Sequence, residues 1–209
     1  MRILDWGLID YRSAVERQES EVEAVASSAL DAIILCTHPP IVTYGRATTP
    51  DDLKDWTGDR FEVSRGGRAT YHGPSQLVIY PILNLQRDRR SFKSRDVHAY
   101  LRALENATVK AMHALGLFGA ESRTSGAGET LLTGVWVGEK KIASLGIAIR
   151  KWVTYHGVAI NVAHDPQAFQ GIRPCGFAPS VMTSLELELG HTVANVKSVC
   201  AEAFSSTLD

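Results

Sequence analysis

The chain is poor in cysteine, in net charge and in long apolar runs, and each shortage excludes a class of protein. Its 209 residues include three cysteines, Cys36, Cys175 and Cys200, an odd number without C-x-x-C spacing. That pattern argues against a disulfide framework and against a zinc ribbon. A formal net charge of −1 gives no overall electrostatic reason to expect nucleic-acid binding. No apolar run reaches the roughly eighteen residues of a transmembrane helix, so none is expected.

The N-terminus lacks the features of a targeting sequence. Residues 1–12 carry the acids Asp5 and Asp10 and have no continuous apolar stretch, so neither a signal peptide nor a transit peptide is predicted. The 44% hydrophobic and 22% charged fractions are typical of a soluble globular protein. We therefore expect a cytoplasmic protein without membrane attachment.

The spacing of apolar residues predicts an α+β fold. Strands are expected at 2–9, 32–37, 41–45, 61–64, 76–85, 134–137, 141–150 and 152–162. Helices are expected between 15 and 29, from 94 to a stop at Gly116, after a capping box at 183–186, and at 192–204. No linker or repeat interrupts the chain. The sequence thus predicts a single domain over residues 1–209, with helices on one face of a mixed, largely antiparallel sheet.

A glycine-rich segment, RGGRATYHGPSQLVIYP at residues 65–81, has more functional side chains than a hairpin needs. Glycine lets a backbone pass close to a ligand. We expect this turn to aim Arg65, Arg68, Tyr71 and His72 at one point.

The tetrapeptide Thr-Tyr-His-Gly of this segment recurs at residues 154–157. This repeat allows two interpretations. His72 and His156 face each other across the site as a metal pair or proton relay, or each imidazole forms a local hydrogen bond within the sheet. The sequence favours local hydrogen bonds, above all for His156, and no metal, because no third ligand has suggestive spacing.

Cys175 and Lys141 are the candidate catalytic residues. Cys36 and Cys200 follow apolar strand and helix patterns, whereas Cys175 lies in the loop Arg-Pro-Cys-Gly without apolar periodicity. Lys141 shares a strand face with Ala143 and the apolar residues at 145, 147 and 149, so it is buried there or extends to solvent at the strand end. An unperturbed thiol, with a pKa of about 8.5, is only a few per cent thiolate at neutral pH, and a nearby ammonium stabilises the thiolate. The pair is suited to proton transfer while Cys175 attacks a carbonyl.

Several motifs occur in order between about residue 39 and residue 185: RGG-x-x-TYHGP-x-QLV-x-YP, GEKKIASLG, HGVAINV, and RPCG followed by TSL. Together they resemble the lipoyl(octanoyl) transferases, whose fold resembles the catalytic domain of biotin and lipoate protein ligases. The resemblance implies transfer of an octanoyl group from octanoyl-acyl carrier protein to a lysine of lipoyl domains, those of 2-oxoacid dehydrogenase complexes and the glycine cleavage H protein, in lipoate biosynthesis. No cofactor or ATP is implied, because the acyl thioester is already activated, and a monomer is expected.

The same resemblance assigns residue roles. Cys175 would be the acyl-thioester nucleophile, and Lys141 would lower its pKa and act as general acid and base. The acyl pocket would be lined by Arg65, Gly66, Gly67, Arg68, Ala69, Thr70, Tyr71, His72, Ser144, Leu145, Gly146, Gly157, Val158 and Ala159. Two positions depart from the family pattern. Ser75 replaces a glycine, which destabilises the fold by about 1 kcal/mol if the position needs positive φ. Arg68 stands where the family commonly has Asp or Gln.

Two other functions stay open at this stage. A lipoate- or biotin-type protein ligase would share the architecture and use an acyl-adenylate without a cysteine, and a non-catalytic acyl-binding module would keep only the pocket. A basic run at 87–95 is also a candidate docking surface for an acidic acyl carrier protein, or an ordinary solvated loop.

Overall fold

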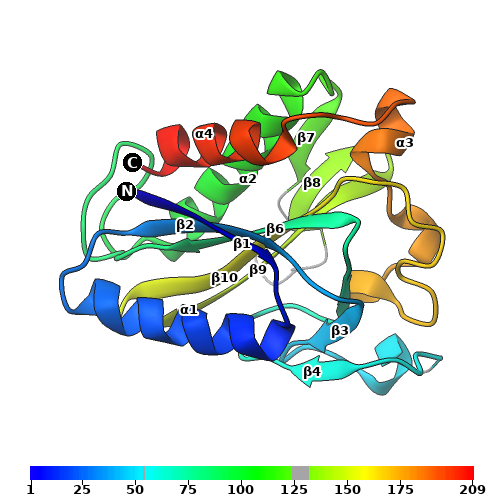
Figure 1. Ribbon diagram of the computed structural model, residues 1–209, viewed down its shortest axis with the longest axis horizontal. Helices are drawn as coiled ribbons and strands as arrows, with labels where there is room; N and C mark the ends of the chain where they lie inside the picture. The colour runs from blue at the N-terminus through cyan, green and yellow to red at the C-terminus, as the bar shows by residue number, and fades with distance from the viewer. Residues whose placement is uncertain (54, 124–131) are drawn as a thin grey trace.

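A computed structural model describes residues 1–53, 55–123 and 132–209, arranged around a seven-stranded mixed sheet (Figure 1). The strand order of this sheet is β1-β2-β6-β10-β9-β8-β7, and a smaller sheet has the order β4-β3-β5. The strands are β1 (Arg2–Leu8), β2 (Ala32–Thr37), β3 (Ile41–Tyr44), β4 (Arg60–Glu62), β5 (Thr70–His72), β6 (Gln76–Ile82), β7 (Ala120–Arg123), β8 (Gly134–Val137), β9 (Lys140–Arg150) and β10 (Val153–Asn161).

The predicted mixed, largely antiparallel sheet is confirmed. Among the strands that the structure describes, β1 pairs in parallel with β2 and β3 with β4, and the other ladders are antiparallel. The expected placement of the helices on one face was wrong. Helix α1 (Tyr11–Ala26) packs on one face against β6 and β10, whereas α2 (Val97–Ala114) and α4 (Val196–Leu208) pack on the other (Figure 1).

The burial of the central strands explains this two-sided cover. All seven residues of β6 are buried, and so are the first five of β2. Strands covered on both faces have continuous apolar runs in place of the alternation that marks a half-exposed sheet. The runs at 32–36 and 76–82 therefore indicated helices on both faces, a signal that the sequence interpretation missed.

Most predicted elements exist, with corrections at their ends and two omissions. Helix α2 stops before Gly116, which has a φ of 93°. The short helix α3 (Leu185–Leu189) is capped by Ser184, not by Thr183 as the capping-box prediction had it, because the Thr183 hydroxyl donates to the Glu188 carboxylate. The C-terminal helix begins four residues later than predicted, at Val196 against 192. Strands β5 and β7 were not predicted. No helix in the described ranges is long and apolar enough to cross a membrane.

Two glycines allow close contacts at the centre of the sheet. A Cβ on Gly157 of β10 would lie 2.2 Å from the Ile79 carbonyl oxygen of β6, so only glycine fits between the two strands. Gly157 pairs with Gly146 of β9, where a Cβ would lie 2.8 Å from Cδ of Arg65. The paired glycines open a slot in the sheet face, and the Arg65 side chain lies against it.

Candidate active site

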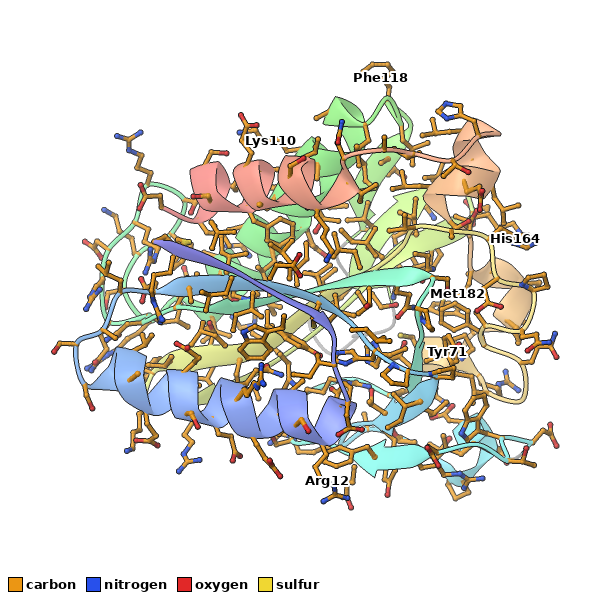
Figure 2. All side chains as sticks on the ribbon, viewed as in Figure 1. Arg12, Tyr71, Lys110, Phe118, His164 and Met182 are labelled. Atoms are coloured by element: carbon orange, nitrogen blue, oxygen red, sulfur yellow. The ribbon has the colours of Figure 1, made fainter. Side chains whose placement is uncertain are left out.

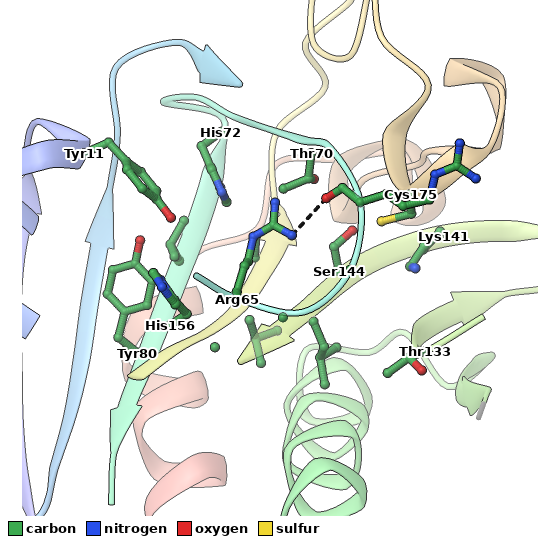
Figure 3. Close-up of a pocket in the computed structure, with 18 residues that line it drawn as sticks. Tyr11, Arg65, Thr70, His72, Tyr80, Thr133, Lys141, Ser144, His156 and Cys175 are labelled. Carbon is green, nitrogen blue, oxygen red and sulfur yellow. Dashed lines mark hydrogen bonds between the residues drawn. The ribbon is translucent and has the colours of Figure 1, made fainter. Parts of the chain in front are cut away.

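A pocket lies where the glycine-rich loop covers β9 and β10. It is lined by Tyr11, Arg65, Gly67, Arg68, Thr70, His72, Val78, Tyr80, Thr133, Lys141, Ser144, Leu145, Gly146, His156, Gly157, Val158, Ala159 and Cys175. Figure 3 shows Cys175 and Lys141 at one end and the histidines with Tyr11 and Tyr80 at the other. The pocket is therefore a slot with two candidate reactive groups at one end.

Cys175 is held in a strained backbone conformation at this end. It lies in the 3₁₀ turn η2 (Pro174–Gly176) with φ 53° and ψ 22°, a left-handed conformation that a non-glycine residue rarely adopts. Its backbone N–H donates to the Ala69 carbonyl at 2.8 Å, which ties the turn to the glycine-rich loop. Cys36 and Cys200 are buried, and burial raises the pKa of each thiol to about 12. Cys175, only partly buried, is the accessible thiol of the three.

Lys141 is buried, as strand parity predicted, with 1% of its surface exposed. The ladder of β8 and β9 shifts register beside it, so the neighbouring Ile142 is buried as well. The Lys141 carbonyl accepts the backbone N–H of Thr183 at 3.0 Å. This contact places the segment that follows the Cys175 turn alongside β9, and it explains how two distant parts of the sequence meet at one end of the pocket.

Two aromatic rings and a glycine position the Lys141 side chain. Its Nζ lies 5.3 Å from the ring centroid of Trp136 and 5.8 Å from that of Phe177. The two rings contact each other at 5.5 Å. Gly134 has φ 148°, and a Cβ there would lie 2.6 Å from Cε of Lys141. The side chain of Lys141 thus lies along the backbone of β8 and below two rings.

Trp136 and Phe177 were missed by the sequence interpretation. Trp136 lies among buried residues of β8, and nothing in the sequence marks it as a site residue. Phe177 lies two residues after Cys175, and this proximity was the signal available for it. Trp136 is 3% exposed, and its Nε1 donates to the Leu132 carbonyl at 2.7 Å. A desolvated cation–π contact contributes about 1 to 2 kcal/mol, so Trp136 is a candidate positioning residue for Lys141.

The octanoyl transfer that the sequence resemblance implies is expected to slow by about tenfold when leucine replaces Trp136, because an apolar side chain without a π face leaves the Lys141 ammonium less well held. The measurement is kcat and KM for transfer, and we expect kcat to fall while KM for the donor changes little. Trp136→Phe is the matched control, since it keeps a ring at this position. Equal losses in both variants would show that Trp136 acts through packing alone.

The Arg65 side chain stabilises the glycine-rich loop by hydrogen bonds to backbone carbonyls. Its guanidinium donates to the carbonyls of Gly66 at 3.1 Å and Thr43 at 3.0 Å. It also donates to the Arg68 carbonyl at 2.9 Å, the dashed line in Figure 3. The Thr43 hydroxyl accepts a further hydrogen bond at 2.9 Å. Arg65 is 7% exposed and joins the glycine-rich loop to β3. It lines the pocket, as predicted, with much of its donor capacity used by the protein backbone.

The expectation that the loop aims all its polar side chains at one point was wrong for Tyr71. Residues 70–72 form strand β5, in which successive side chains point to opposite faces. Thr70 and His72 line the pocket, whereas Tyr71 packs away from it with Phe169 and Met182 (Figure 2). Of the fourteen predicted pocket residues, Gly66, Ala69 and Tyr71 do not line the pocket. The other eleven line it, and so do the two candidate catalytic residues.

The far end of the pocket contains residues that were not predicted to bind substrate. Val78 and Tyr80, two residues apart on β6, both face the pocket. Tyr11 lines it from the buried face of α1. The alternation of Val78 and Tyr80 was visible in the sequence, but which face it addressed was not. Thr133, which also lines the pocket but lies on the Lys141 side in Figure 3, gave no signal in the sequence.

The histidines at this end are buried and neutral. His72 Nε2 contacts the Thr43 hydroxyl at 3.3 Å, and the backbone N–H of His156 donates to the Gln18 side chain at 2.8 Å. The Nδ1 atoms of both rings have no hydrogen-bond partner among the described residues. The predicted local hydrogen bond is found at one ring nitrogen of His72, whereas the hydrogen bond of His156 is made by its backbone and not by its imidazole. Burial, with a smaller contribution from Arg65, lowers the pKa of His156 to about 3. Burial also holds the pKa of His72 well below its usual value.

The free energy of unfolding is expected to fall as pH decreases from about 6.5 toward 3. In that window the unfolded chain binds a proton at His156 and the native state does not, so stability is complete above the unfolded pKa and is lost below it. His156→Asn should reduce this slope by up to about 1.4 kcal/mol per pH unit, since asparagine does not titrate and tolerates the φ of 59° at this position. Urea unfolding at pH 4 to 7 measures it. Exposed His164→Asn is the control, and an unchanged slope in His156→Asn would contradict the prediction.

Two sequence expectations outside the pocket are revised. Ser75 does not adopt positive φ, so its replacement of glycine carries no strain of that kind. In the basic run at 87–95, Arg89 is 7% exposed at its side chain, pairs with Asp31 and donates to the Leu208 carbonyl at 3.0 Å. The run lies beside the chain termini, at the opposite end of the molecule from η2 (Figure 1). This position does not favour a carrier docking surface next to Cys175.

The fold is that of the lipoate and biotin protein ligase catalytic domains. A putative lipoate protein ligase from T. acidophilum superposes with a TM-score of 0.78 over 99% of this chain and 85% of that chain, at 18% identity. A biotin protein ligase mutant from Aquifex aeolicus superposes with a TM-score of 0.54 over 100% of this chain and 70% of that chain, at 12% identity. At these identities the likeness concerns the fold alone.

Sequence comparisons define the family. The model of the lipoyl protein ligase A/B catalytic domain matches residues 10–205. An octanoyltransferase of Bdellovibrio bacteriovorus is 50% identical over 195 residues, covering 90% of this chain and 89% of the relative. A probable octanoyltransferase of Pyrobaculum calidifontis is 39% identical, covering 100% of this chain and 86% of the relative. The chain belongs to the lipoyl protein ligase A/B catalytic domain family and, within it, to the octanoyltransferases.

Proposed function

We propose that this chain is an acyltransferase that moves an octanoyl group from octanoyl-acyl carrier protein to a lysine of lipoyl domains, through a thioester on Cys175. Residues 1–209 form its single catalytic domain in this proposal. The observation that carries it is the meeting of Cys175, the accessible thiol of the three cysteines, and buried Lys141 at one end of the pocket. Each residue type is unusual in its position, and together they provide a nucleophile and a group that exchanges protons.

The reaction proceeds in two steps. In the first, the Cys175 thiolate attacks the donor thioester carbonyl, a new C–S bond forms, and the departing carrier thiolate takes a proton from Lys141. In the second, the lysine amine of the lipoyl domain attacks the Cys175 thioester. Lys141 accepts a proton from that amine as the C–S bond to Cys175 breaks and the amide forms. One site thus serves two protein substrates in turn, and the energy of the thioester makes ATP unnecessary.

The slot between Cys175 and the distal aromatic residues suits an octanoyl tail. Its walls include Leu145, Val158 and Ala159, with Gly146 and Gly157 leaving room for the chain against the backbone. Burying seven carbons at about 0.8 kcal/mol each contributes on the order of 5 kcal/mol to binding. The lipoyl domains of 2-oxoacid dehydrogenase complexes and the glycine cleavage H protein are the proposed acceptors. A monomer in the cytoplasm, where thiols stay reduced, is the proposed working form.

An ATP-independent transfer assay tests the proposal. The chain is incubated with octanoyl-acyl carrier protein and a lipoyl domain, and octanoylation of the acceptor lysine is followed by mass spectrometry. We expect transfer without ATP, and an acid-stable, hydroxylamine-sensitive adduct on the chain when the acceptor is omitted. Transfer only from free octanoate with ATP would assign a ligase in its place. Binding of octanoate without adduct or transfer would assign an acyl-binding module.

A further inference from the structure

Arg68, which departs from the family pattern, is partly exposed and forms an ion pair with the buried Asp52 next to the Cys175 turn. Its Nε contacts Oδ2 of Asp52 at 2.9 Å and its Nη2 contacts Oδ1 at 2.5 Å, a bidentate arrangement. Asp52 lies in the 3₁₀ helix η1 (Pro50–Leu53) and its side chain is fully buried. Burial raises its pKa, but hydrogen bonds from Arg68 and from the Thr49 N–H outweigh this and hold the pKa below its usual value. The pair is therefore ionised and fixed.

The residues of this pair contact the Cys175 turn on both sides. The Arg173 N–H donates to the Asp52 carbonyl at 3.0 Å, two residues before Cys175. The N–H of Cys175 donates to the carbonyl of Ala69, the neighbour of Arg68, at 2.8 Å. After Cys175, Gly176 packs on the guanidinium so closely that a Cβ would lie 2.4 Å from Nη1 of Arg68.

These contacts hold the Cys175 turn in a strained backbone conformation. Cys175 and Gly176 have successive φ angles of 53° and 86°. A non-glycine residue in this region is strained and persists only where its surroundings hold it. In the part of the chain that the structure describes, the N–H groups of Arg173 and Cys175 donate to the carbonyls of Asp52 and Ala69, and Gly176 lies against the Arg68 guanidinium.

We propose that Asp52 and Arg68 are positioning residues that brace the Cys175 turn, so that the sulfur is held at the pocket end in the geometry that acyl transfer requires. The expected effect on the rate of transfer rests on the proposed function. The brace itself, which is the Asp52–Arg68 pair with its contacts to the Cys175 turn, rests on geometry alone. Because the Asp52 carboxylate neutralises Arg68, the pair acts through position. A role of Arg68 as a cation that stabilises the thiolate is the competing account.

The brace is tested with Asp52→Asn, Arg68→Gln and the double variant, with Asp51→Asn as the matched control on the exposed face of the same 3₁₀ helix. Hydrogen exchange of the peptide spanning residues 173–177 is measured first. We expect exchange to be about tenfold faster in both single variants, because the turn loses its fixed partners, and unchanged in Asp51→Asn. Since Arg68 is partly exposed, Arg68→Gln keeps the test valid if Asp52→Asn fails to fold. Unchanged exchange in a folded Arg68→Gln variant would overturn the proposal.

Single-turnover acylation by octanoyl-acyl carrier protein is measured next. We expect a loss of roughly tenfold or more in each single variant, with the double variant no slower than either, since both break one unit. The pH midpoint of iodoacetamide alkylation separates the cation account. If Arg68 acts as a cation on the sulfur, Arg68→Gln moves the midpoint up and Asp52→Asn moves it down, and such opposite shifts would overturn the brace. If wild-type chain forms no thioester, the proposed function fails, while the exchange result still decides the brace.

Discussion

Lys141→Arg is expected to keep Cys175 reactive toward iodoacetamide while octanoyl transfer falls roughly a hundredfold or more. Arginine retains the positive charge near the sulfur, but its guanidinium stays protonated in proteins and cannot accept the proton of the acceptor amine. Lys141→Ala is expected to lose both properties. The measurements are the alkylation rate at fixed pH and kcat for transfer, made on the same preparations.

The position of Lys141 requires a control for packing. Its Nζ lies over two rings and its stem runs along Gly134, so the larger arginine also perturbs the site. Thermal unfolding of each variant reports this perturbation, and exposed Lys140→Arg, whose Nζ contacts the Ser180 carbonyl at the surface, is the matched control. Transfer by Lys141→Arg at a near-normal rate would remove the general-base role and leave Lys141 as an electrostatic neighbour.

The sequence predicted what depends on local pattern. The burial of Lys141 followed from strand parity, and the accessible position of Cys175 followed from the absence of apolar periodicity around it. Both are properties of a short segment. The stop of α2 at Gly116 is of the same kind, because a glycine with positive φ ends a helix by its own backbone preference.

What the sequence did not predict depends on contacts between distant segments. Tyr71 was misplaced because residues 70–72 pair with residues 41–43 of β3, far back in the sequence, and become a strand. Phe177 approaches Lys141 because the segment after the Cys175 turn adds to β9 through Met182, whereas Trp136 is the direct partner of Lys141 across the β8–β9 pairing. Asp52 lies outside every predicted helix and strand, and its pairing with Arg68 has no local signal. Such partners are fixed by tertiary packing.

Cys175→Ala is expected to abolish the octanoyl adduct and to reduce transfer to the limit of detection, because the thioester has no other accessible thiol on which to form. Cys36 and Cys200 are both buried with thiol pKa values of about 12, so almost no thiolate exists on either near neutral pH. Incubation with octanoyl-acyl carrier protein, followed by peptide mapping, should locate the acyl group on the peptide that contains Cys175.

Cys200→Ala is the control for this variant. It removes a thiol from the core formed by α2 and α4 and should keep the adduct and transfer, at a cost in unfolding free energy of about 1 kcal/mol, because a small cavity forms. Cys175→Ala should show no such loss of stability, since the turn is partly exposed and shortening the side chain to alanine removes few packing contacts there. An adduct at the wild-type level in Cys175→Ala would show that another group carries the acyl chain. A wild-type rate of transfer without any adduct would instead assign direct attack by the acceptor lysine, with Lys141 alone in the catalytic role.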